Sequence, residues 1–180
     1  MEASFLVRVA PAFATLLDEP GELWREVADD VRAALAADAP AAADGVGRFV
    51  DAVANEPLEA LRELHARTFD LMPVCAPYLS VHLFGEESFK RAGLMGGLAG
   101  AYRAVGFDTG GELPDHLVLV LRFMPAMTAE EQDDLVQYVL KPGVDRMAGV
   151  FSRSGNPYRY LIQSLLATLT RQVGPETVHA

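Results

Sequence analysis

The stretch that decides the fold class lies at residues 114–124 and reads PDHLVLVLRFM. Apolar residues follow one another here without regular polar interruptions, so no face of the segment is consistently polar. A helix that is apolar on almost every side is normally buried at the centre of a domain. Pro114 opens the stretch, and proline is favoured in the first turn of a helix. We therefore predict a central buried helix that begins at Pro114.

Helical spacing of apolar residues extends to both sides of this stretch. Residues 5–17 and 23–35 carry apolar stripes at intervals of three and four, with Pro11 predicting a kink or a late start in the first. Further helices are predicted over residues 47–55, from 57, from about 77 to 85, over 88–105, from 128 to 151 with a break near 141–142, and from 157. Because strand-like alternation between hairpin turns is missing, we predict an all-α fold, a single bundle of about seven to nine helices.

The length of 180 residues suits one domain, which we place at residues 1–180. Residues 37–44 are rich in Ala and contain Pro40, so they predict a flexible connection between helices. Residues 172–180 are expected to form a short flexible tail. Gly106 is predicted to end one helix in the left-handed conformation, and the pair Thr128 and Glu131 has the spacing of a capping box that starts another.

Composition narrows the class of protein and its compartment. The formal net charge is −10, from 15 Lys and Arg against 25 Asp and Glu, which argues against nucleic acid or an anionic membrane as the partner. No apolar run approaches the roughly 20 residues of a membrane span, so stable membrane insertion is not expected. The N-terminus has no basic region and Arg8 interrupts its apolar stretch, so we expect no signal peptide and a cytoplasmic location.

Few residues have the spacing of a catalytic or metal site. The four histidines, which include His65 and His82, show no ligand spacing, so neither a metal nor another cofactor is expected. Cys75 is the single cysteine, so an intramolecular disulfide is impossible, and its apolar neighbours predict a buried thiol with a raised pKa. Residues 93–100 carry the four glycines of a Gly-x-x-Gly-Gly-x-x-Gly run, which we interpret as a surface where another helix packs closely.

The segment Glu112-Leu113-Pro114-Asp115-His116 has two interpretations. Proline and an acidic residue suit the start of a helix, which explains Pro114 and Asp115 without any function. Alternatively, a carboxylate and an imidazole beside an apolar helix orient a partner while the apolar surface supplies affinity. The residues alone leave both interpretations open.

Together with its surroundings, this segment resembles the TorD/DmsD/NarJ family of redox-enzyme maturation chaperones, nearest the nitrate reductase delta-subunit (NarJ) branch. The hallmark Glu-Pro-Asp-His stretch stands here as Glu112-Leu113-Pro114-Asp115-His116-Leu117, the interrupted form of that branch. Shorter matches follow the same order along residues 10–170, from LLDEP at 16–20 through LFGE at 83–86 to SGNPY at 154–158. Ser80 departs from the pattern, since the family often has an aromatic residue at that position.

The resemblance implies an all-helical chaperone that is not an enzyme. Its partner would be the catalytic subunit of a molybdoenzyme, held by an N-terminal leader-like peptide in the cytoplasm while molybdenum cofactor is inserted before export or membrane docking. The predicted peptide contacts are Glu112, Asp115, His116, Tyr78, Phe84 and Tyr102, with Leu113, Pro114 and Leu117 shaping the motif. We expect a monomer or a weak homodimer.

Two other classes remain open at this stage. One is a small hydrolase in which Asp115 and His116 act together as a general base, although no nucleophile motif accompanies them. The other is a helical scaffold or ligand-binding regulator without peptide chaperone activity, which should ignore leader peptides.

Overall fold

The computed structural model describes residues 5–71 and 73–173, and it confirms the all-α fold within that part of the chain. The helices run in the order α1 (Phe5–Leu17), α2 (Trp24–Ala36), α3 (Pro40–Ala52), α4 (Leu58–Phe69), α5 (Leu79–Phe84), α6 (Phe89–Val105), α7 (Leu117–Phe123), η1 (Met124–Ala126), α8 (Ala129–Leu135), η2 (Val136–Leu140), α9 (Lys141–Phe151) and α10 (Tyr158–Val173).

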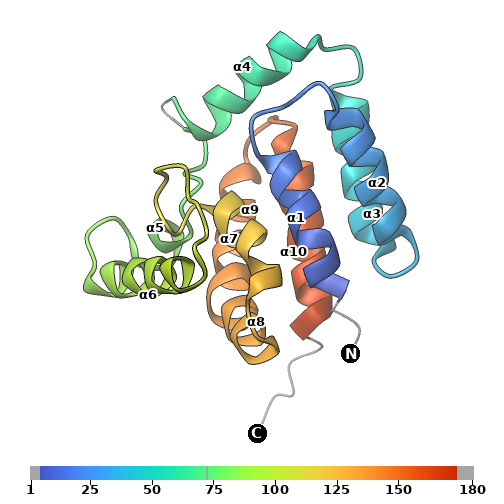
Figure 1. Cartoon of the computed structure of the whole chain (residues 1–180). Helices are drawn as coiled ribbons and strands as arrows, with labels where there is room; N and C mark the ends of the chain where they lie inside the picture. Colours follow the sequence, from blue (N-terminus) through green and yellow to red (C-terminus); the bar gives the residue numbers. More distant parts are fainter. Residues whose placement is uncertain (1–4, 72, 174–180) are drawn as a thin grey trace, which may run out of the picture.

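The first and last helices form the middle of the bundle. In Figure 1, α1 and α10 lie side by side, with α2 and α3 on one side and α7, α8 and α9 on the other. Close contacts join α10 to α3, α2 to α3, and α1 to α7. Phe13, Leu161 and Leu165 are fully buried along this axis. Helix α4 crosses one end of the bundle, and α5 and α6 lie at its outer edge (Figure 1).

Aromatic side chains connect α4 to this core. The ring centroids of Phe69 on α4 and Tyr158 on α10 are 5.1 Å apart, as are those of Phe49 on α3 and Tyr158. His65 on α4 is also buried, and its Nε2 lies 3.1 Å from the carbonyl oxygen of Leu17 at the end of α1. These contacts fix the end of α4 beside the end of α1.

Several predicted helix ends are confirmed. Ser88 caps α6 by accepting a hydrogen bond from the Lys90 amide, and Gly106 ends that helix with φ at 67°. Thr128 and Glu131 form the reciprocal capping box at the start of α8. Pro11 lies inside α1 rather than at its start. At 141–142 the helix does not break, because a π-helical turn at η2 carries α8 directly into α9.

Three further sequence predictions are wrong in detail. The connection predicted over residues 37–44 is only three residues long, because Pro40 occupies the first turn of α3. The buried helix begins at Leu117 with His116 as its N-cap, not at Pro114. The glycines of α6 do not receive a close neighbour, since a Cβ atom added at Gly93, Gly96, Gly97 or Gly100 would meet nothing within 4 Å.

The remaining structural expectations concern the tail and the membrane. Helix α10 continues through residues 172 and 173, and the rest of the predicted tail at 172–180 lies outside the described residues. Within residues 5–71 and 73–173, no helix is both long and apolar enough to cross a membrane.

Candidate functional site

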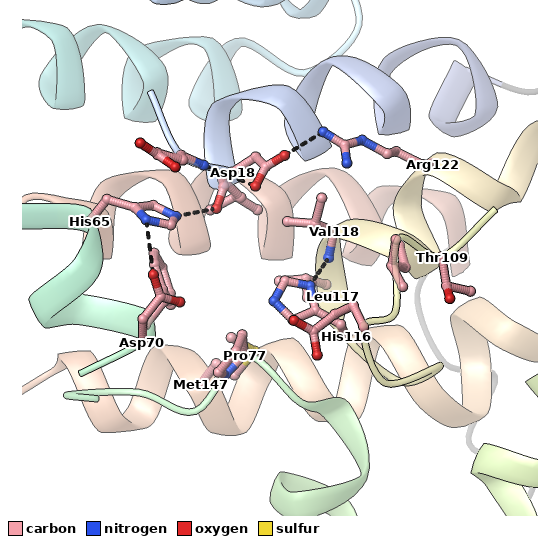
Figure 2. Close-up of a pocket in the computed structure, with 15 residues that line it drawn as sticks. Asp18, His65, Asp70, Pro77, Thr109, His116, Leu117, Val118, Arg122 and Met147 are labelled. Atoms are coloured by element: carbon pink, nitrogen blue, oxygen red, sulfur yellow. Dashed lines mark hydrogen bonds and ion pairs between the residues drawn. The ribbon is translucent and has the colours of Figure 1, made fainter. Parts of the chain in front are cut away.

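A cavity of about 240 Å³ opens where the C-terminal ends of α1 and α4 meet the N-terminal end of α7. Figure 2 shows these three elements around it, with Pro77 and Met147 below and Thr109 at one side. The apolar part of its lining consists of Leu17, Phe69, Pro77, Leu117, Val118, Leu119 and Met147. This lining exists because α1 and α4 each end on an apolar residue that faces the core.

Half of the polar lining residues are acidic. The polar part of the lining consists of Asp18, Glu19, Asp70, Glu112, Thr109, Arg122 and the two histidines His65 and His116. Arg122 donates a hydrogen bond to Asp18, so the one arginine of the lining is paired (Figure 2). The C-terminal ends of two helices add partial negative charge to that of the carboxylates. The cavity therefore favours a cationic group over an anionic one.

His116 links the cavity to the start of α7. Its Nδ1 accepts a hydrogen bond of 3.3 Å from the Val118 amide, which caps the helix and leaves Nε2 to carry the proton of the neutral ring. Burial lowers the pKa of His116, against the opposing influence of Glu112, Asp18, Asp70 and Asp115. A neutral ring suits this cap, because a protonated Nδ1 cannot accept the amide hydrogen.

A short antiparallel pairing fixes His116 relative to α5. The Leu79 amide donates to the Asp115 carbonyl at 3.0 Å, and the Leu117 amide donates to the Pro77 carbonyl at 2.9 Å. The Tyr78 ring meets the His116 ring edge-on, with centroids 5.5 Å apart. Two segments nearly forty residues apart in the chain are thereby held together at the cavity.

Tyr78 and Glu112 form a second contact at the cavity. The Tyr78 hydroxyl donates to Glu112 Oε1 at 3.1 Å, and the same oxygen accepts the Leu113 amide at 2.8 Å. Burial, with a further contribution from the hydrogen bond to Glu112, raises the pKa of Tyr78, so the hydroxyl stays a donor. Glu112 is exposed and its carboxylate remains accessible from solvent. Of the predicted site residues, these two and His116 lie together.

The sequence prediction that Asp115 presents its carboxylate to a partner is wrong. It is fully buried, and its Oδ2 accepts hydrogen bonds from the amide and the hydroxyl of Ser80. Its Oδ1 has no hydrogen-bond partner among the described protein atoms. The chain reverses between Pro114 and Leu117 to enter α7, and this reversal points the carboxylate inward. Asp115 therefore supports the cavity from behind rather than lining it.

The other predicted contacts are spread out. Tyr102 is buried on α6, and its hydroxyl donates to the Pro114 carbonyl at 2.7 Å, so it holds the motif from behind. Phe84, at the end of α5, is 38% exposed but does not line the cavity. Leu113 is exposed beside Glu112 but does not line the cavity, and Leu117 is buried in the cavity wall.

Sequence reasoning missed three of the four acidic residues of the lining, which are Asp18, Glu19 and Asp70. Asp18 and Asp70 each directly follow the last residue of a helix, and His65 lies one turn before the end of α4. Asp70 Oδ2 is 3.8 Å from His65 Nδ1 (Figure 2). The signal available in the sequence was an acidic residue at a helix C-terminus, where it is unfavourable unless another contact compensates. Nothing in the sequence places the two helix ends together.

These features define an all-α protein with a cavity that has both acidic and apolar lining residues. The residues described contain no cluster of three metal-ligating side chains. The model of the nitrate reductase delta subunit family matches residues 30–162, which include α3 to α9, and the chain belongs to that family. No curated protein sequence matches the chain. A crystal structure of a protein described as a redox enzyme maturation protein from Archaeoglobus fulgidus has the same fold, with a TM-score of 0.61 and 18% identity over 94% of this chain and 96% of that one.

Proposed function

We propose that this protein is a cytoplasmic maturation chaperone, not an enzyme, for the catalytic subunit of a molybdoenzyme related to nitrate reductase. It binds the N-terminal, leader-like segment of that subunit and keeps the subunit open while molybdenum cofactor is inserted, before export or membrane docking. The family membership and the fold shared with a redox enzyme maturation protein support this role. The observation that carries the proposal is the combination of apolar and acidic residues in the cavity lining. The acidic residues, which we call the acidic rim, are Asp18, Glu19, Asp70 and Glu112.

The cavity suits part of a peptide better than a whole small molecule. Sites that enclose small molecules usually have volumes of about 300–1,000 Å³, and this one has about 240 Å³. It can accept one or two side chains of an amphipathic helix whose remaining residues lie across the rim. Glu112 and Asp70 would attract lysine or arginine residues of the same peptide, and His116 and Tyr78 would contact it beside them.

The contacts of Asp115 and His116 argue against the hydrolase alternative. Asp115 uses its carboxylate on Ser80, and His116 uses Nδ1 on the Val118 amide. An Asp–His general base would need the carboxylate to orient the imidazole through a hydrogen bond. The two residues instead support the backbone on either side of the entry to α7.

Calorimetric titration tests the proposal directly. The ligand is a synthetic peptide that copies the N-terminus of the molybdoenzyme catalytic subunit encoded beside this protein. We expect saturable 1:1 binding that is lost when the apolar face of the peptide is made polar. We also expect affinity to fall as salt increases, because rim charges are screened. A scaffold or regulator without chaperone activity would bind neither peptide. Light scattering on the same samples tests the expectation of a monomer or weak homodimer.

Charge-removing variants test the position of the site. Glu112→Gln and Asp70→Asn should each weaken binding by about 1 kcal/mol, the scale of an exposed ion pair. Asp51→Asn, on the exposed side of α3, is the matched control and should bind as the original protein does. Equal binding by all three variants would show that Glu112 and Asp70 do not contribute to peptide binding.

A further inference from the structure

Helix α6 lies at the outer edge of the bundle (Figure 1), but its Tyr102 makes a hydrogen bond to the segment of residues 112–116 that borders the cavity. Only Leu98 and Tyr102 of its residues are buried, and Phe89 at its start is 99% exposed. Because so few of its side chains are buried, α6 contributes little to the hydrophobic core. Its polar contacts, by contrast, converge on two consecutive residues of the cavity segment, Pro114 and Asp115.

The first contact runs through the hydroxyl of Ser80. Arg91 Nε donates to Ser80 Oγ at 3.0 Å, and Ser80 Oγ in turn donates to Asp115 Oδ2. A hydroxyl can accept one hydrogen bond while donating another, so the charge of Arg91 strengthens the bond that Ser80 makes to the carboxylate. Arg91 also donates through Nη1 to the Glu86 carbonyl at 3.2 Å, which fixes the guanidinium between α5 and α6. Ser80 and Asp115 are both fully buried, so water does not compete with this connection.

The second contact comes from the other half of α6. The Tyr102 hydroxyl donates to the Pro114 carbonyl at 2.7 Å. The Tyr102 ring is held in place by Phe123 on α7, with centroids 4.6 Å apart, and by Phe107, at 5.1 Å. Burial raises the pKa of Tyr102, which keeps its hydroxyl a donor. Pro114 and Asp115 are therefore both held from α6, directly or through Ser80.

The residues so held lie directly beside those that face the cavity. Glu112 precedes Pro114 by two positions, and His116 follows Asp115. A shift of Pro114 or Asp115 would move the backbone between Glu112 and His116, and the same stretch of backbone makes the hydrogen bonds with Leu79 and at Leu117.

We propose that Arg91, Ser80 and Tyr102 are positioning residues for the peptide site, through which α6 sets the placement of Glu112 and His116. This inference rests on the proposed peptide-binding function of the cavity. It makes the affinity for peptide depend on α6, although α6 itself contributes no residue to the cavity lining.

The test combines peptide titration with hydrogen exchange of single amides in the full chain. Arg91→Ala should weaken peptide binding about tenfold, the scale of one hydrogen bond to a charged group. The amides of Leu79 and Leu117, which make the pairing, should exchange faster, while core amides of α1 and α10 keep their protection. Lys90→Ala removes a neighbouring, exposed positive charge of α6 and is the matched control. Arg91→Lys should recover part of the affinity, because an ammonium can still donate to Ser80.

A double-mutant cycle separates the proposed connection from general destabilisation. If Arg91 acts through Ser80, adding Ser80→Ala to Arg91→Ala should cost much less affinity than Ser80→Ala alone. Additive losses, or equal exchange at Leu79 and Leu117 in the Arg91→Ala and Lys90→Ala variants, would overturn the inference. If the unaltered protein binds no peptide, the proposed function fails, and the exchange rates at these two amides still decide whether α6 positions the segment.

Discussion

Asp115 and His116 are adjacent in sequence but lie in opposite environments, because the chain reverses direction between Pro114 and Leu117. Asp115 turns into the interior and bonds to Ser80, while the half-buried His116 faces the cavity and caps α7. Both are polar residues before an apolar helix, and sequence alone treats them alike. In the structure, Asp115 supports residues 112–116 from the interior, and His116 lies on the surface of the cavity.

At Asp115, replacement should destabilise the fold. Asp115→Ala leaves the buried amide and hydroxyl of Ser80 without their acceptor. We expect the free energy of unfolding to fall by about 1–3 kcal/mol, the scale for leaving buried donors unsatisfied. Urea denaturation measures this, with Asp145→Ala on the exposed surface of α9 as control. Equal stability of both variants would mean that the carboxylate contributes nothing to the fold.

At His116, burial should make stability depend on pH. Its pKa in the folded protein lies below the ordinary value of 6.5, so the unfolded chain binds a proton first as pH falls. Stability is therefore lost as pH drops below about 6.5, until the folded state also becomes protonated. His116→Asn keeps an N-cap acceptor without titrating. In urea denaturation at pH 7.5 and 5.5, the original protein should lose more stability than this variant; equal losses would contradict the expectation.

Helix ends marked by a capping side chain or a terminal glycine were predictable, because a few neighbouring residues determine them, whereas the starts of α3 and α7 were predicted wrongly. The capping box at α8, the Ser88 cap and the left-handed Gly106 all depend on side chains within about four residues. How a helix packs depends on residues far away in the chain. The glycines of α6 therefore misled the prediction, since they face open space, whereas Gly143 on α9 closely approaches Leu79 on α5.

Substitution at these two kinds of glycine should have opposite effects. Gly97→Ala adds a methyl group where nothing lies within 4 Å. It should raise the free energy of unfolding by about 0.5–1 kcal/mol, because alanine loses less backbone entropy in a helix. Gly143→Ala places its Cβ 2.8 Å from Cδ2 of the buried Leu79. It should lower stability by about 1–3 kcal/mol through overpacking. Thermal or urea denaturation compares them, and destabilisation by Gly97→Ala would indicate that α6 packs against a neighbour after all.

At the scale of the whole molecule, the core encloses the single cysteine, Cys75. Cys75 is 2% exposed, and burial raises the pKa of its thiol to about 12. Its Sγ lies 3.8 Å from His82 Nε2, which itself lies 2.8 Å from the Ala76 carbonyl oxygen. This environment confirms the sequence prediction of a buried thiol.

Thiol labelling should therefore report opening of the fold. Only the thiolate reacts, so at pH 8 the native protein should be labelled by a disulfide reagent about a hundredfold or more slowly than the protein in urea. The rate is followed by absorbance as the reagent is released. Rapid labelling of the native protein without urea would show that the segment around Cys75 opens independently of the bundle.

The all-α class, most helix positions and a candidate site at residues 112–116 could be predicted from the sequence. These follow from apolar periodicity, from caps and from a resemblance carried by short ordered motifs, all of which are local along the chain. Three features appear only in the packed fold: Asp115 is buried, Asp18, Asp70 and His65 line the cavity, and α6 holds Pro114 and Asp115. These depend on which helix ends meet. That choice is fixed by packing among residues far apart in sequence, and no local pattern encodes it.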